Sequence, residues 1–140
     1  MIKKILFMIL MSGLMLAACS SSRNGSPSNT NENATLAPVP MEYAGLTNPL
    51  GADAATQGAE IFHTNCEMCH GPQGHGDGPA GQALDPKPRN LAELQTKASD
   101  DFLFWRIREG KPGTSMVTWK GILTDEQIWQ AISFIRTLKP

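Results

Sequence analysis

The sequence predicts an all-α domain of roughly three to five helices, and the clearest signals lie near its C-terminus. From Ile128 onward, apolar residues recur at the spacing of one helical face almost to the end of the chain. Thr124, with Gln127 three residues later, has the pattern of a capping box, which predicts that this helix begins there. Another helix is predicted from Asp100 or Asp101 to Gly110, where Gly110 and Pro112 end it. Its apolar residues are Phe102, Leu103, Trp105 and Ile107.

Two further helices are expected earlier in the chain. One contains Gly58 and Phe62 and leads into a pair of cysteines, and a short one is expected within residues 91–97. Glycine inside a helix costs about 1 kcal/mol relative to alanine. Gly58 is therefore expected to have a packing role.

Composition and charge narrow the classes of protein. The 140 residues allow one ordinary domain, and 41% of them are hydrophobic, as in a globular chain. Twelve basic and 13 acidic residues give a net charge of −1, so a nucleic-acid partner is not expected. The three cysteines, Cys19, Cys66 and Cys69, are too few for a disulfide scaffold, and each needs its own explanation.

The N-terminus has the pattern of an export signal. Lys3 and Lys4 precede an apolar run that is too short to cross a bilayer and ends in Leu-Ala-Ala-Cys19. This ending resembles the lipobox of bacterial lipoproteins. The resemblance implies that residues 1–18 are a lipoprotein signal peptide and that Cys19 carries lipid. The protein would then be anchored to a cell membrane and face the periplasm or the cell exterior. An uncleaved anchor helix is the alternative.

Residues 19–52 are predicted to be the lipidated cysteine and a flexible linker. From residue 20 to 40 the chain consists mostly of Ser, Asn, Thr, Pro and Gly, which cannot bury enough apolar surface to offset the entropy of ordering. Residues 41–51 contain Tyr43, Leu46 and Leu50, and either lie against the domain or belong to the linker. The folded domain is expected over residues 53–140.

The motif that decides the chemistry is Cys66-Glu67-Met68-Cys69-His70. Cys-x-x-Cys-His is the pattern of covalent c-type haem attachment, in which both sulfurs form thioether bonds and the histidine binds the iron. A zinc site would need a further ligand at a usual spacing, which the sequence lacks. A thioredoxin-like redox pair would need a βαβ context, whereas the flanking sequence predicts helix and a glycine-rich loop.

Met116 is the candidate for the second axial ligand of the iron. It lies far beyond His70 in the sequence, on a segment long enough to reach the opposite face of a haem. Met68 stands between the two cysteines, and Met41 lies in or beside the linker. His63 and His75 are too close to the motif in sequence. The alternative is that Met116 is only an apolar filler.

Together these features resemble a class I c-type cytochrome over residues 53–140. The resemblance rests on Gly58 and Phe62, the haem motif followed by Gly71, and the glycine-rich segment of residues 71–81. It also rests on residues 85–91, on Met116 with Trp119, and on the C-terminal aromatic helix. The lipobox and linker add a resemblance to small monohaem lipoprotein cytochromes, such as the monohaem subunit of alternative complex III. Val117 departs from the pattern, because many relatives have proline after the ligand.

The resemblance implies a class I cytochrome c fold around one covalently bound haem, with the first and last helices crossing near Gly58. It also implies partners for the haem propionates, for which the candidates are Arg89, Asn90 and the indole of Trp119. A proline carbonyl is expected to accept a hydrogen bond from His70. The candidate residues for this acceptor are Pro79, Pro86 and Pro88.

The predicted function is that of a membrane-anchored electron carrier, not an enzyme, acting with redox partner proteins in a respiratory or photosynthetic chain. Iron with both axial positions filled exchanges electrons and offers no place for a substrate. The first alternative is a fixed haem subunit of a larger membrane oxidoreductase. The second is a ligand-binding haem sensor or peroxidase-like protein. A basic surface that attracts an acidic partner is also expected, formed by Arg106, Arg108, Lys111 and Lys120.

Overall fold

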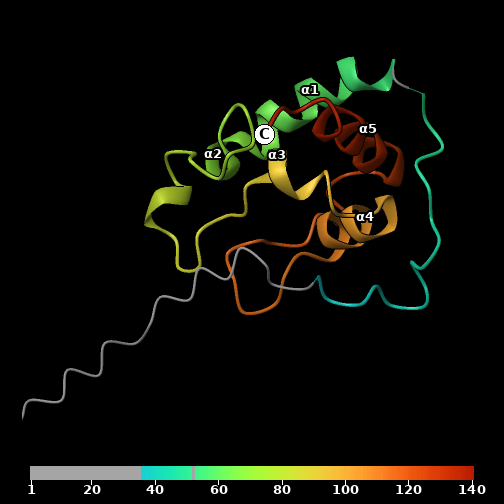
Figure 1. Cartoon of the computed structure of the whole chain (residues 1–140), viewed down its shortest axis with the longest axis horizontal. Helices are drawn as coiled ribbons and strands as arrows, with labels where there is room; N and C mark the ends of the chain where they lie inside the picture. The colour runs from blue at the N-terminus through green and yellow to red at the C-terminus, as the bar shows by residue number, and fades with distance from the viewer. Residues whose placement is uncertain (1–35, 52) are drawn as a thin grey trace, which may run out of the picture. The chain divides into compact units, whose positions relative to one another are not determined.

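The computed structural model describes residues 36–51 and 53–140 (Figure 1). Within these residues the chain forms helices and no β-strand, so the all-α prediction is confirmed. None of the described helices has the length and apolar character needed to span a bilayer. The predicted signal peptide, the predicted lipid attachment at Cys19 and about half of the predicted linker lie outside the described residues. The elements are α1 (Ala54–Asn65), α2 (Glu67–His70), the 3-10 helix η1 (Gly81–Ala83), α3 (Leu91–Leu94), α4 (Asp100–Glu109) and α5 (Asp125–Ile135).

The predicted capping box begins α5. The Thr124 hydroxyl accepts a hydrogen bond from the Gln127 N–H at 3.1 Å, and the Gln127 side chain accepts one from the Thr124 N–H at 2.9 Å. Asp125 and Glu126 occupy the first turn, where carboxylates interact favourably with the helix dipole. Both predictions for the start of this helix, its position and its cap, are confirmed.

Helices α1 and α5 pack against each other at Gly58. A Cβ atom placed at this position would lie 1.9 Å from the Gln130 carbonyl oxygen, so only glycine allows this separation of the backbones. Phe62, one turn later on α1, is completely buried, and its ring centroid lies 5.0 Å from that of Phe134 on α5. The predicted packing role of Gly58 is therefore confirmed.

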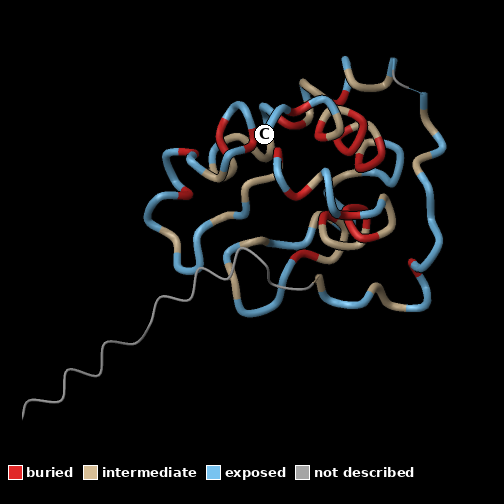
Figure 2. Tube along the Cα trace, viewed as in Figure 1, coloured by how far each residue is buried: buried red, intermediate tan, exposed pale blue. Residues whose placement is uncertain are grey.

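Helix α4 completes the core on the other side of α5. The ring of Phe104 stacks on Trp129 with 4.3 Å between the ring centroids. In Figure 2 buried positions concentrate along α4 and α5. The largest side chains with almost no exposed surface are Phe62, Ile128 and Ile132, which places the centre of the core between α1 and α5.

A segment before α1 also packs against the domain. We call residues 41–50 the strap. Its Asn48 donates from the backbone N–H to Asp100 at 3.0 Å, and from the side chain to the Trp129 carbonyl and the Ser133 hydroxyl at 3.1 and 2.9 Å. The strap is therefore attached to both α4 and α5. The packed domain therefore begins before residue 53, the boundary predicted from the sequence. Hydrogen bonds from the strap to α4 and α5 replace hydrogen bonds to water there.

Asp100 joins three parts of the fold. Its carboxylate accepts hydrogen bonds from Asn48 and, at 3.1 Å, from Nε of Arg136 just after α5. Burial alone would raise the pKa of Asp100, but these hydrogen bonds and the positive charge of Arg136 outweigh it, and the pKa is lowered. The carboxylate is therefore ionised at neutral pH, which suits its role as a shared acceptor.

Candidate functional site

The two cysteines lie where α1 passes into α2. The Cys66 N–H donates to the Phe62 carbonyl at 2.8 Å, which extends α1 by one residue, and the His70 N–H donates to the Cys66 carbonyl at 2.9 Å. Both cysteines are free and partly buried. Burial, followed by the proximity of Cys69, raises the pKa of Cys66 to about 12. These thiols are presented on one helical turn and are not used in a disulfide.

His70 is oriented by a backbone carbonyl. Its Nδ1 lies 3.2 Å from the carbonyl oxygen of Arg89, and as the donor in this bond Nδ1 carries the proton. Nε2 then keeps its lone pair free for a metal. Burial lowers the pKa of His70, although the hydrogen bond to Arg89 opposes this, so the ring is neutral at pH 7 as a ligand must be.

The acceptor is therefore not one of the prolines, and that prediction is wrong. Asn90 is the N-cap of α3, and its side chain accepts from the Glu93 N–H at 3.1 Å. The residue before an N-cap lies outside the helix, so the Arg89 carbonyl has no helical partner and is available to His70. The sequence pattern Asn-Leu-Ala-Glu (residues 90–93) contained this signal, because it predicts a helix start at Asn90.

The glycine-rich segment packs against the backbone of α2. At Gly78 a Cβ atom would lie 2.5 Å from the carbonyl oxygens of both Glu67 and Met68, so a side chain is excluded there. The Ala80 N–H donates to the Met68 carbonyl at 3.0 Å, and the Gly76 N–H donates to the His70 carbonyl at 2.8 Å. The segment thus supports the helical turn that carries the cysteines and the histidine.

Met116 lies in the loop between α4 and α5, which we call the methionine loop (residues 110–120). Its carbonyl accepts from the Lys111 N–H at 2.9 Å, and its own N–H donates to the Thr114 hydroxyl at 3.2 Å. The loop is also attached to the end of α4, where the Trp119 N–H donates to the Arg108 carbonyl at 3.1 Å. Met116 is partly buried, whereas the next residue, Val117, is 58% exposed.

The other methionines and histidines considered from the sequence are in less suitable positions. Met41 is 90% exposed and Met68 is 61% exposed. His63 is exposed and its Nδ1 lies 2.5 Å from a Glu67 carboxylate oxygen, while Nε2 of His75 lies 3.3 Å from the Lys139 carbonyl. These residues have solvent or protein partners, which leaves Met116 as the best candidate for a second axial ligand.

The three candidate propionate partners are positioned differently. Arg89 has an exposed side chain and contributes its carbonyl to His70. Asn90 uses its side-chain oxygen to cap α3, which leaves its amide N–H groups as donors. Trp119 is partly buried, and its backbone anchors the methionine loop. Their predicted contacts with propionates remain predictions.

The predicted basic surface is partly neutralised by neighbouring acids. Arg108 lies 3.0 Å from both Glu109 and Asp125, and Lys120 lies 3.4 Å from Glu109. Two cations and two carboxylates sum to zero formal charge. The prediction that Arg108 and Lys120 contribute to a basic surface is therefore wrong. In the folded chain Glu109 and Asp125 lie next to these two residues and neutralise their charge.

Comparison with known proteins identifies the family. The family described as cytochrome c matches residues 55–139. The chain belongs to the cytochrome c family. Cytochrome c6 of Thermosynechococcus vestitus is 31% identical over 86 residues, which make up 61% of this chain and 70% of that protein. Cytochrome c6 of Thermostichus vulcanus matches with the same identity and coverage.

A solved structure supports the assignment of the fold of this cytochrome. One chain of a reducing HAO-like protein complex from Kuenenia stuttgartiensis has a TM-score of 0.57 and 25% identity to it. The match covers 69% of this chain and 48% of the other, so the relative is about twice as long as the matched part. The predicted class I c-type cytochrome fold is confirmed.

As a cytochrome c, the protein carries covalently attached haem c and is a haem-based electron carrier. The residues of the site fit this group. Two free thiols separated by two residues suit two thioether bonds, and a neutral histidine with Nε2 unprotonated suits iron. No cluster of three or more His, Cys, Asp or Glu side chains that could hold a metal ion occurs within the described part of the chain.

Proposed function

We propose that this cytochrome is a membrane-tethered monohaem carrier that transfers single electrons between redox partner proteins. Cys66 and Cys69 hold the haem through thioether bonds, His70 and Met116 are its axial ligands, and Cys19 carries the lipid. The observation that best supports the ligand assignment is the hydrogen bond between Nδ1 of His70 and the Arg89 carbonyl, because it leaves Nε2 free to bind iron.

The chain's own residues favour electron transfer over catalysis. When bound, the haem supplies one-electron exchange between ferrous and ferric iron. With His70 and Met116 both bound to the iron, no coordination site would be left open to a substrate. The Arg89 carbonyl holds the His70 ring in one tautomer and orientation, so that the ligand does not rearrange when the charge of the iron changes.

The haem propionates need donors in the same region of the fold. The Arg89 guanidinium, the Asn90 amide N–H groups and the Trp119 indole N–H are the proposed donors, since an unpaired carboxylate is costly to bury. The cap made by Asn90 supports this assignment, because its oxygen is already occupied and its nitrogen is the group that remains.

A difference spectrum tests the haem assignment directly. Full-length protein exported from cells with a cytochrome maturation system is expected to show the sharp reduced-minus-oxidised bands of low-spin c-type haem. A pyridine haemochrome assay is expected to give one covalently bound haem per chain. A colourless protein from such cells would contradict the proposal.

The membrane tether is tested at Cys19. The sequence that supports it is the apolar run ending in Leu-Ala-Ala-Cys19. We expect the full-length protein to sediment with membranes and to incorporate labelled fatty acid, because two or three acyl chains give stable anchoring. Cys19→Ser is expected to remove the label. If the Cys19→Ser protein still incorporates fatty acid, the lipid is attached elsewhere and the assignment is wrong.

A fixed subunit of a larger membrane oxidoreductase is the second candidate. The observation that favours it is the structural similarity to one chain of a protein complex from Kuenenia stuttgartiensis. Gel filtration after extraction in a mild detergent separates the two. A free carrier elutes as a single small protein in its detergent micelle, whereas a fixed subunit elutes in a large complex.

A further inference from the structure

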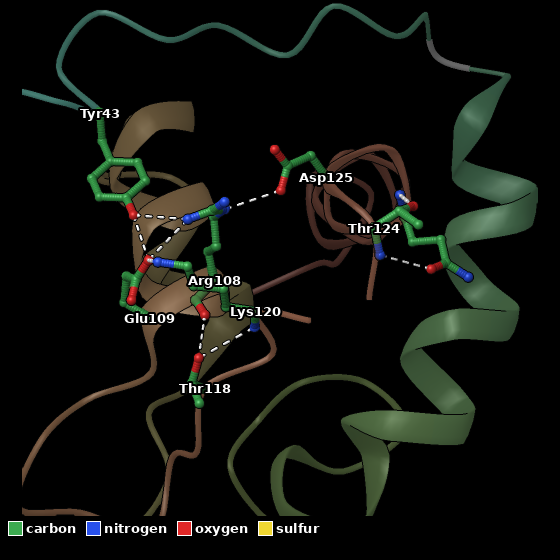
Figure 3. Close-up of polar contacts among 8 residues, drawn as sticks. Tyr43, Arg108, Glu109, Thr118, Lys120, Thr124 and Asp125 are labelled. Carbon is green, nitrogen blue, oxygen red and sulfur yellow. Dashed lines mark hydrogen bonds and ion pairs between the residues drawn. The ribbon is translucent and has the colours of Figure 1, made fainter. Parts of the chain in front are cut away.

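The strap is linked to the end of α4 by a buried tyrosine. Tyr43 is 8% exposed, and its hydroxyl donates to a carboxylate oxygen of Glu109 at 2.5 Å. The same hydroxyl accepts from the Arg108 guanidinium at 3.2 Å, and Arg108 donates in turn to Asp125 at the start of α5. Figure 3 shows these side chains converging from the strap, α4 and α5. We call Tyr43, Arg108, Glu109, Lys120 and Asp125 the tyrosine cluster.

The tyrosine cluster also contacts the methionine loop. The Glu109 oxygen that accepts from Tyr43 lies 3.4 Å from Nζ of Lys120. At the same place, the Arg108 carbonyl accepts from the Thr118 hydroxyl at 2.7 Å (Figure 3). It also accepts from the Lys120 N–H at 2.9 Å. The last carbonyls of α4, which lack helical partners, are therefore satisfied by the methionine loop.

Apolar packing alone does not hold this loop. Val117, next to Met116, is 58% exposed. Valine at this position also leaves the backbone φ angle free, whereas a proline would fix it. The position of Met116 thus depends strongly on polar contacts at the end of α4. Tyr43 connects the strap to these contacts through Glu109 and through Arg108.

We propose that Tyr43 is a positioning residue for Met116, acting through Glu109 and Lys120 to hold the methionine loop against the end of α4. The proposal rests on the assignment of Met116 as an axial ligand. It gives the strap a role in setting how strongly Met116 binds the iron.

The charges in the tyrosine cluster agree with a positioning role for Tyr43. The hydrogen bond to Glu109, followed by burial, raises the pKa of Tyr43, so the phenol keeps the proton that it donates. The hydrogen bond from Tyr43 is also the main cause that lowers the pKa of Glu109, ahead of burial, which opposes it, and of the attraction of Lys120. Glu109 is therefore ionised at neutral pH and can attract Lys120 from the loop while it binds Tyr43 from the strap.

The test is the competition between Met116 and added imidazole for ferric iron in the full-length haem-loaded protein. Tyr43→Phe removes the hydroxyl and keeps the ring. It is expected to raise the apparent imidazole affinity about threefold to tenfold, the effect of one hydrogen bond of ordinary strength. The absorption band given by sulfur bound to ferric haem should be lost at correspondingly lower imidazole concentrations.

Asn48→Ala is the matched control on the same strap. Asn48 is bonded to α4 and α5 but not to the methionine loop, so this variant should lower the unfolding temperature without changing imidazole affinity. Lys120→Met tests whether Tyr43 acts on Met116 through Lys120. If Tyr43 acts through Lys120, the effects of Tyr43→Phe and Lys120→Met are smaller in combination than their sum.

The outcomes separate this inference from the ligand assignment. If Met116→Ala raises imidazole affinity but Tyr43→Phe does not, or if Asn48→Ala raises it as much as Tyr43→Phe, the inference is overturned and Met116 remains the ligand. Additive effects of Tyr43→Phe and Lys120→Met would overturn the route through Lys120. If the sulfur band is missing from the unaltered protein and Met116→Ala changes nothing, the ligand assignment fails and this inference fails with it.

Discussion

Met116→Ala is expected to convert this cytochrome from a protein that resists carbon monoxide into one that binds it readily. On the proposed ligation, the sulfur of Met116 occupies the position that carbon monoxide needs on ferrous iron. Alanine has no donor atom and leaves that position to water or to an added ligand. The reduction potential should also fall, because methionine opposite histidine raises it, and axial ligands set haem potentials over a span of roughly 0.8 V.

The measurement is a carbon monoxide titration of the dithionite-reduced protein, together with a potentiometric titration. Val117→Ala is the matched control, since Val117 is the neighbouring residue and its side chain is largely exposed. That variant is expected to keep the spectrum and the potential of the unaltered protein. An unaltered protein that already binds carbon monoxide readily would contradict the ligation and favour a ligand-binding sensor or a peroxidase-like protein.

Features that depend on neighbouring residues could be predicted from the sequence. The capping box of Thr124 and Gln127 is a pattern of four positions, and the structure contains both of its hydrogen bonds. The spacing of Cys66, Cys69 and His70 predicted covalently attached haem c, and family membership confirms that cofactor. The assignment of these three residues as its attachment site stays a prediction. In these cases the interacting groups lie within one helical turn, so the local pattern largely determines the geometry.

Features that depend on tertiary contacts could not be predicted in the same way. The acceptor for His70 is a backbone carbonyl. Every residue has this group, whatever its side chain, so the residue types could not distinguish Arg89 from the prolines. Tyr43 and Glu109 are 66 positions apart, and nothing local in either segment predicts their hydrogen bond. The predicted contribution of Arg108 to a basic surface failed for the same reason, because the acids that neutralise it include one on a different helix.

The largest structural effect is expected from removing both haem-attachment cysteines. Replacing Cys66 and Cys69 together by alanine prevents both thioether bonds and should leave the domain largely unfolded. A domain of this size has a small core, and a bound cofactor whose site does not exist in the unfolded chain contributes its binding energy to folding. Helix α2, only four residues long, is too short to be stable alone and depends on what it packs against.

Far-UV circular dichroism and thermal unfolding of the exported protein measure this effect. We expect the double variant to lose most of its helical signal and its cooperative transition. Met68→Ala is the matched control, because Met68 lies between the two cysteines on α2 and is 61% exposed, and it should retain both haem and helix. If the double variant unfolds cooperatively with a native-like spectrum, the contacts of α1, α4 and α5 suffice to fold the chain. The haem would then serve electron transfer without being a structural requirement.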